Sequence, residues 1–350
     1  MESEKIIIAL TKKGSILGRQ LAGLLQIPLK IPQRFVADSK RESGFDCPVG
    51  MVIQEEFFRQ TALILIMATG VAVRSIAPVI KSKLTDPAVL VLDEEGRFVI
   101  SLLSGHWGGA NELAVEIAQL IGATPVVTTA SDLNNLPSLD MIAKENQLLI
   151  TQPSLLPQFA AAIVNGDSLV IWDCLGIEKT WPENVRVETG VFPQLASFEK
   201  LLVILGYEDP PLLLEGVTTI ALRPSCLTVG IGCCSGVPGV RIIGAIRRYF
   251  REHHWSIGSI NQLATIDFKG DEPGIIEASR ELGVPLVTFT KGELQEVLPG
   301  LNVSEFVEGK IGVGGVCEPA AILAANRGQL IGPKMNLSQI TVAVALDNSR

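Results

Sequence analysis

The chain has few of the residues and patterns that mark several common classes of protein. Only 5% of its residues are aromatic, and only three of its 350 residues are histidines. Its six cysteines are scattered, with no CxxC pair and no Cys/His ligand spacing, so the sequence predicts neither a zinc site nor a disulfide framework. A net charge of −8 argues against a nucleic-acid-binding protein.

Long apolar runs are also missing. The longest, such as Ala62–Ala68, is far too short to cross a bilayer, so we expect no membrane contact. The first residues show no cationic start followed by an apolar core and a cleavage site. The sequence therefore favours a cytoplasmic protein.

What is present is an alternation of strand and helix patterns. The chain is 47% hydrophobic and 19% charged, and it is long enough for two or three domains with proper cores. Alternating strands and helices are typical of the α/β class. We expect two three-layer α/β/α domains with mostly parallel sheets, over residues 1–132 and 224–350. A less regular intermediate region, residues 133–223, is expected to join them.

The segment SLLSGHWGGANELA places His106 in a glycine-rich turn between an apolar strand and a helix that begins at Ala110. Gly105, Gly108 and Gly109 allow a tight turn that residues with a Cβ would resist. A helix N-terminus collects unpaired N–H groups and favours an anion, and histidine titrates near neutrality. The pattern predicts an anion site with a proton-transfer group. The alternative is a plain turn with His106 on the surface.

Three more charged residues of the N-terminal half stand beside glycine or proline turns. Arg74 lies in TGVAVRSIAP, and Lys83 and Asp86 lie in KSKLTDPAV. Because Arg74 is the only charge between Ala62 and Ile80, it is expected to need a carboxylate partner or an anionic ligand.

The segment VGIGCCSGVPGV has the strand, glycine loop and helix layout of an anion-binding turn. It lacks the lysine of a P-loop and the acidic residue of a dinucleotide site, so the signal for a nucleotide is weak. For the neighbours Cys233 and Cys234, a packing role is favoured over redox chemistry. The arginines of the following helix, Arg241 and Arg247 among them, are interpreted first as a solvated basic face.

A charged cluster follows the next strand of this half. ATIDFKGDEPG places Asp267, Lys269, Asp271 and Glu272 within six residues, directly after a strand. Strand ends face the ligand crevice in α/β sheets, so the cluster is either part of a site or a charged surface loop. Glu318 falls in the first turn of a helix after GVGGVC, where a carboxylate also complements the helix dipole.

Seven segments together resemble one known family. MATGVAVRSIAP, KLTDPAVLVLDEEG, SLLSGHWGGANELA and TPVVTTASD are similar to the N-terminal part of the CbiG family, the cobalt-precorrin-5A hydrolases of anaerobic cobalamin biosynthesis. VGIGCCSGVPG, LATIDFKGDEPG and GVGGVCEPAAILAA resemble its C-terminal CbiG/CobE-type domain. One position departs from the pattern, because Cys234 stands where the family has a basic residue. Arg241 or Arg247 would then supply that contact, or the contact is dispensable.

The resemblance implies a reaction and a set of roles. The substrate would be a cobalt-bearing tetrapyrrole whose ring-A acetate forms a lactone with C20, and water would open the lactone with release of acetaldehyde. Cobalt would arrive with the substrate, so no cofactor and no protein metal site are expected, and other enzymes of the cobalamin pathway are expected partners. The residues assigned to catalysis are His106, Asn111, Asp267 and Glu318. Those assigned to substrate binding are Arg74, Lys83, Asp86, Ser104, Gly105, Gly108, Gly109, Gly232, Cys233, Lys269 and Glu272.

Two alternatives remain open at this stage. The catalytic group could instead belong to the C-terminal unit, around the GIGCC loop. The protein could also be a non-catalytic tetrapyrrole carrier, which would need the same carboxylate-binding loops without a titrating group.

Overall fold

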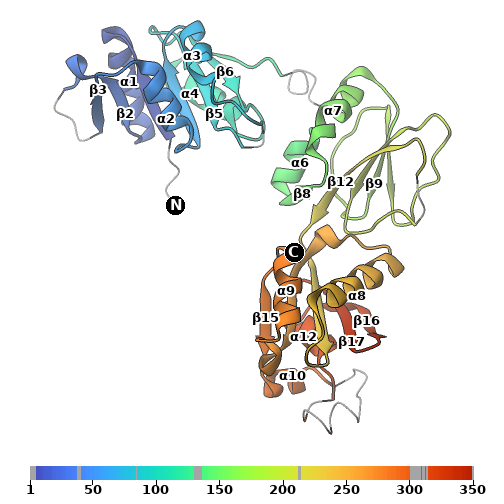
Figure 1. The fold of residues 1–350 in the computed structure, drawn as a ribbon. Helices are drawn as coiled ribbons and strands as arrows, with labels where there is room; N and C mark the ends of the chain where they lie inside the picture. Colours follow the sequence, from blue (N-terminus) through green and yellow to red (C-terminus); the bar gives the residue numbers. More distant parts are fainter. Residues whose placement is uncertain are drawn as a thin grey trace. The chain divides into compact units, whose positions relative to one another are not determined.

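The chain folds into two compact units, Met1–Lys144 and Glu145–Arg350. The computed structural model describes residues 5–37, 41–83, 85–129, 136–211, 214–299, 309, 312 and 314–348. Figure 1 shows that sheets flanked by helices build both units. No helix in these residues has both the length and the apolar character needed to cross a membrane.

Unit 1 contains a seven-stranded sheet in the order β3-β2-β1-β4-β5-β6-β7. The first five strands in this order, β3, β2, β1, β4 and β5, run parallel to one another. Strand β6 runs antiparallel to β5, and β7 runs parallel to β6. The strands are β1 Lys5–Ala9, β2 Leu29–Pro32, β3 Glu42–Phe45, β4 Ala62–Ile66, β5 Ala88–Leu92, β6 Phe98–Leu103 and β7 Thr124–Val126.

Helices cover both faces of this sheet, which makes unit 1 a three-layer structure. Helices α1 (Lys12–Leu25) and α4 (Ala110–Ile121) pack against one face, and α2 (Val49–Phe57) and α3 (Thr69–Ile76) pack against the other. Strands β1, β4 and β5 are almost wholly buried because both of their faces are covered, which explains their continuous apolar runs. Helix α6 (Leu139–Glu145) ends at the boundary of the unit.

The first sheet of unit 2 occupies most of the region that was expected to be less regular. Its strand order is β10-β9-β11-β12-β8, and only β8 is antiparallel. The strands are β8 Leu148–Ile150, β9 Leu169–Asp173, β10 Val185–Thr189, β11 Leu201–Leu205 and β12 Thr218–Pro224, and α7 spans Leu156–Asn165. Loop residues such as Phe192 and Leu214, in place of a helix, cover Trp172 on one face. Long connections without helical periodicity explain why the sequence pattern is weak here.

The second sheet of unit 2 has the order β15-β14-β13-β17-β16. Its strands are β13 Leu227–Cys233, β14 Ile260–Ile266, β15 Leu286–Phe289, β16 Gln329–Leu337 and β17 Ile340–Leu346. Helices α8 (Gly239–Glu252) and α9 (Pro273–Leu282) pack on one face. Helices α10 (Lys291–Glu296) and α12 (Cys317–Ala324) pack on the other face.

These sheets confirm the predicted α/β class with mostly parallel strands. The boundary expected between residues 132 and 133 lies outside the described residues. The boundary expected between 223 and 224 falls at the end of β12, and β13 begins the second sheet three residues later.

Candidate functional site

The loop that carries His106 lies at the edge of the unit 1 sheet where the parallel strands begin. Because β6 is antiparallel to β5, its last residue, Leu103, pairs with Val89 near the start of β5. A Cβ placed on Gly108 would be 3.1 Å from the backbone nitrogen of Ala88, which locates the loop at the same edge. The imidazole of His106 is half-buried, so it is neither enclosed in the core nor fully in solvent.

Backbone hydrogen bonds close this loop tightly. The Gly109 amide donates to the His106 carbonyl at 3.0 Å, and the amides of Ala110 and Asn111 donate to the carbonyls of Ser104 and Gly105. The Gly109 amide thus already has an acceptor within the loop, and its predicted contact with an oxyanion or a substrate carboxylate stays a prediction. Among residues 108–111, only the Gly108 amide has no acceptor within the described structure.

Two glycines of the loop are required by its geometry. A Cβ on Gly108 would lie 2.6 Å from the Cβ of Ser104, closer than such atoms approach in proteins. Gly109 has φ +82° and precedes the first turn of α4, a conformation that favours glycine.

Ser104 and Asn111 form the buried side of the loop. Ser104 has φ +56°, and its buried hydroxyl has no hydrogen-bond partner within the described structure. The Asn111 carboxamide accepts from the Ser101 hydroxyl at 2.6 Å and donates to Thr129 at 3.2 Å. Asn111 therefore links β6 to the segment after β7, and direct contact with a substrate stays a prediction.

The other three charged residues predicted for this half have different surroundings in the structure. Arg74 is exposed on α3, so burial does not force a carboxylate partner on it, and its contact with an anionic ligand stays a prediction. Asp86 is buried and accepts from the backbone amides of Lys81 and Ser82, at 2.9 and 3.0 Å. Asp86 lies two residues before the start of β5, and its carboxylate fixes the turn that carries Lys83.

Lys83 has a buried partner that the sequence did not suggest. Its ammonium lies 2.7 Å from Oδ2 of Asp140, and the Ser138 hydroxyl donates to the other carboxylate oxygen. Burial raises the pKa of the Asp140 carboxyl, but the hydrogen bonds from Lys83 and Ser138 and the charges of Lys83 and His106 lower it below its usual value. In sequence, Asp140 looks like an ordinary acidic residue in a helix's first turn, which is why no motif indicated it.

In unit 2, the CCSGVPG loop and the FKGDEPG loop are bonded to each other. The Lys269 ammonium donates to the Ser235 hydroxyl at 2.8 Å and to Glu272 Oε2 at 2.7 Å, and the Gly236 amide donates to Glu272 Oε1 at 2.6 Å. Lys269 lowers the pKa of the Glu272 carboxyl. The two motifs are thus neighbours, as a shared site requires.

Cys233 lies beside this pair and stays a thiol. Burial raises the pKa of its thiol. The charge of Lys269 lowers this pKa, whereas the Glu272 carboxylate raises it, and the net shift is upward. Asp267 is exposed and accepts from the amide of Phe268. Cys233 therefore lacks the lowered pKa of an activated thiol, and the catalytic role predicted for Asp267 stays a prediction.

Gly232 lies in β13 and Glu318 lies in the first turn of α12. A Cβ on Gly232 would be 2.6 Å from the Thr341 hydroxyl of the neighbouring strand, so the residue is needed for close packing. Glu318 is 3% exposed and accepts from the Lys334 amide at 2.9 Å. This bond links α12 to β16, and the catalytic role predicted for Glu318 stays a prediction.

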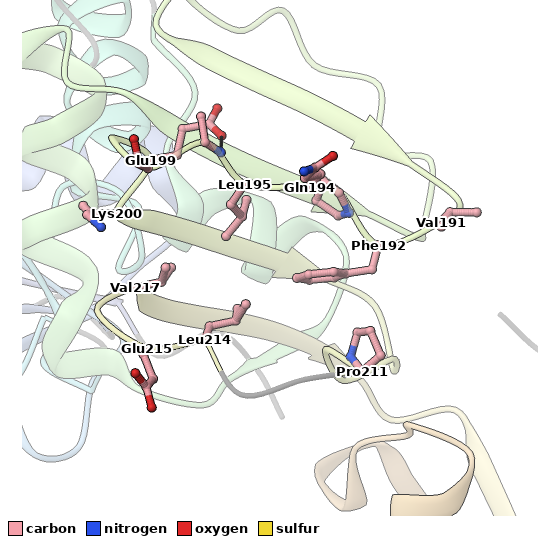
Figure 2. A pocket seen from close by; sticks show the side chains of 13 residues that line it. Val191, Phe192, Gln194, Leu195, Glu199, Lys200, Pro211, Leu214, Glu215 and Val217 are labelled. Atoms are coloured by element: carbon pink, nitrogen blue, oxygen red, sulfur yellow. Dashed lines mark hydrogen bonds between the residues drawn. The ribbon is translucent and has the colours of Figure 1, made fainter.

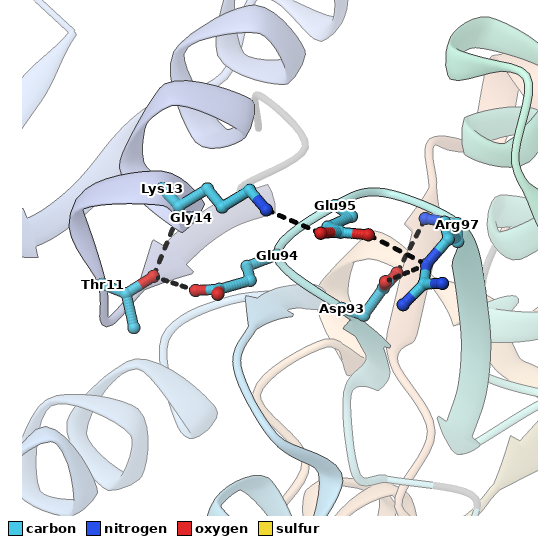
Figure 3. Close-up of polar contacts among 7 residues, drawn as sticks. All are labelled: Thr11, Lys13, Gly14, Asp93, Glu94, Glu95 and Arg97. Carbon is cyan, nitrogen blue, oxygen red and sulfur yellow. Dashed lines mark hydrogen bonds and ion pairs between the residues drawn. The ribbon is translucent and has the colours of Figure 1, made fainter.

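A cavity of about 420 Å³ lies at the opposite, carboxyl edge of the unit 1 sheet, where strand order reverses between β1 and β4. Ligands commonly bind at such a point in open α/β sheets. Here the Thr11 hydroxyl accepts from the Gly14 amide and donates to Glu94 at 2.6 Å, as Figure 3 shows. Glu94 thus brings a negative charge to the start of α1, where a substrate carboxylate would otherwise be favoured.

A larger groove of about 600 Å³ lies beside the first sheet of unit 2. Figure 2 shows Phe192, Leu195, Leu214 and Val217 directed toward one another from two loops. Among the described residues, no three His, Cys, Asp or Glu side chains gather as a metal site requires.

Comparison with known proteins agrees with the order of these motifs. The family model for the cobalamin synthesis G N-terminal domain matches residues 51–132, and that for the cobalamin synthesis G C-terminus matches residues 227–345. A protein of Priestia megaterium named cobalt-precorrin-5A hydrolase is 33% identical over 97% of this chain and 94% of its own length. The chain belongs to the CbiG family. A Salmonella typhimurium protein of the same name is 32% identical over 97% of both chains, and the protein CobE of a Sinorhizobium species is 30% identical over 34% of this chain and 79% of its own.

The two family models match some of the candidate site residues and leave others outside their ranges. The His106 loop and Lys83 fall in the N-terminal range, and Lys269 falls in the C-terminal range. Asp140 lies outside both ranges, as does the first sheet of unit 2.

Proposed function

We propose that this CbiG protein opens the ring-A acetate lactone of cobalt-precorrin-5A with water and releases C20 with its methyl group as acetaldehyde, giving cobalt-precorrin-5B. The observation that carries the proposal is identity at 32–33% over nearly the whole chain to two proteins named for this hydrolysis. The cobalt belongs to the substrate.

The His106 loop supplies the groups that ester hydrolysis requires. His106 accepts a proton from water as the water oxygen attacks the lactone carbonyl carbon. The Gly108 amide, which has no acceptor within the described structure, donates to the oxyanion that develops. The bond between the acyl carbon and the lactone oxygen then breaks, leaving the ring-A acetate and a hydroxyl on C20.

Carbon–carbon cleavage follows from that hydroxyl. When it loses its proton, the bond that holds C20 to the macrocycle breaks, and acetaldehyde leaves. The electron pair stays on the macrocycle, which then takes up a proton. We assign the exchange of these protons to His106, whose side chain is half-exposed in the loop.

Lys83 supplies a fixed positive charge for the carboxylate arms of the substrate. Lys83 lies in the turn before β5, at the same edge of the sheet as the His106 loop, and 48% of its side chain is exposed. A local cation is needed here because the whole chain carries a charge of −8 and repels a polyacid.

The experiment is incubation of the full chain with cobalt-precorrin-5A, with acetaldehyde and the corrinoid product measured together. Acetaldehyde release in proportion to substrate consumed supports the hydrolase. Binding of the corrinoid with no acetaldehyde would instead identify a carrier. The His106→Gln variant is the matched control, since it keeps the size and polarity of the side chain but does not titrate.

A further inference from the structure

Asp140 stands out among the described residues as a buried acid at the His106 edge with no part in the motifs of the family. The residue is 3% exposed, and its carboxylate contacts the Lys83 ammonium and the Ser138 hydroxyl. The Asp86 carboxylate fixes the turn that carries Lys83, and that turn leads into Ala88, which the Gly108 loop approaches closely. The acid thus lies at the same edge of the sheet as the loop, and the charge of His106 helps to lower the pKa of its carboxyl.

The two partners of this ion pair differ greatly in exposure. Asp140 has 5% of its side chain exposed, whereas Lys83 has 48% exposed. An ammonium has three N–H donors, and the bond to Asp140 uses one of them. The buried carboxylate holds the lysine, whose side chain is still half-exposed and whose ammonium has two further N–H donors.

A negative charge beside a site for a polyacid has two opposite consequences. An acid that only contributed its charge would repel substrate carboxylates, so its removal would strengthen binding. An acid that holds the lysine in place avoids the entropy cost of ordering that side chain when substrate binds, so its removal would weaken binding. These two roles predict changes of opposite sign.

We infer that Asp140 is a positioning residue of the His106 site, where its buried carboxylate fixes the Lys83 ammonium to receive a carboxylate of the substrate. The inference rests on the proposed function for the identity of the substrate. The geometry of the pair does not depend on it, so the two are tested separately.

The first test needs no substrate. The Asp140 carboxyl is titrated by carbon-13 NMR in the full chain and in the Lys83→Met variant, with Lys81→Met as the control from the same turn. Loss of Lys83 removes a hydrogen bond and a charge that lower the pKa of Asp140, so its titration midpoint should rise in that variant alone. An unchanged midpoint would show that the pair does not form in solution, and the inference would be wrong.

The second test uses acetaldehyde release from cobalt-precorrin-5A. Asp140→Asn should raise KM by about tenfold while changing kcat less, and the double variant with Lys83→Met should be no worse than Lys83→Met alone. Asp140→Glu should restore part of the loss, and Glu145→Gln, at the exposed end of α6, should have no effect. A lower KM in Asp140→Asn, or additive effects in the double variant, would overturn the inference. Absence of activity in the unmodified chain would count against the proposed function alone, because the NMR test would still stand.

Discussion

The lysine beside the His106 loop and the lysine beside the CCSGVPG loop have the same partner chemistry but opposite surroundings. In each, a lysine ammonium lies 2.7 Å from a carboxylate oxygen near a glycine-rich turn. The Lys83 side chain is 48% exposed, whereas Lys269 and Glu272 are only 12% and 10% exposed. Lys83 is thus free to meet a ligand on one side, while Lys269 bonds two loops together. The same pair of groups therefore holds two loops together in unit 2, whereas in unit 1 we propose that it serves substrate binding.

The largest expected effect is on catalysis in unit 1. His106→Ala should lower kcat by about 10²–10⁴-fold, because proton transfer by a placed group contributes that much. The measurement is the single-turnover rate of acetaldehyde release. His254→Gln, a change at an exposed histidine of unit 2, serves as the control and should leave the rate unchanged. A His106→Ala rate within a few-fold of the unmodified chain would move catalysis away from this loop.

The next largest effect is expected on stability, from a change of packing in the same loop. Gly108→Ala places a methyl group 2.8 Å from the Ser104 carbonyl oxygen and 2.6 Å from the Ser104 Cβ. We expect a loss of about 1–3 kcal/mol in the free energy of unfolding, as in other overpacked sites. Urea denaturation measures it, and Gly70→Ala is the matched control because a Cβ there meets no neighbouring atom within 4 Å. Equal stability of the two variants would show that the loop is looser than described.

The comparison of the two lysines predicts a smaller effect in unit 2. Lys269→Met removes one hydrogen bond that joins the CCSGVPG and FKGDEPG loops, to Ser235, and one within the FKGDEPG loop, to Glu272. The free energy of unfolding should therefore fall by about 1–2 kcal/mol. Its KM should change less than that of Lys83→Met. If Lys269→Met instead raised KM more than Lys83→Met with no loss of stability, the assignment of the two roles would have to be exchanged.

Much of the fold could be predicted from sequence, since apolar runs such as Ala62–Ile66 and the amphipathic pattern of α8 follow directly from burial. The first sheet of unit 2 could not, because loops in place of a helix cover one of its faces and provide no periodic signal. Motif reasoning correctly gathered Ser235, Lys269 and Glu272 by way of their loops. It missed Asp140 because the contact with Lys83 joins positions 57 residues apart, and no local pattern encodes it.

The smallest expected effect is on the pH dependence of stability. It should differ between Asp140 and Glu272, the carboxylate partners of the two lysines. The hydrogen bonds and charges around Asp140 and Glu272 hold the pKa of each carboxyl below its usual value in the folded state. A lowered pKa means that each carboxylate stabilises the fold above about pH 4, and that this contribution disappears as pH falls through the folded value. We expect Asp140→Asn to flatten the acid dependence of hydrogen exchange in β5 only, and Glu272→Gln to flatten it in β14 only. Exchange measured on the full chain between pH 3 and 6 tests this. A response of both strands to either variant would mean that the two carboxylates stabilise a single cooperative structure, so that the contrast between the units would not extend to their stability.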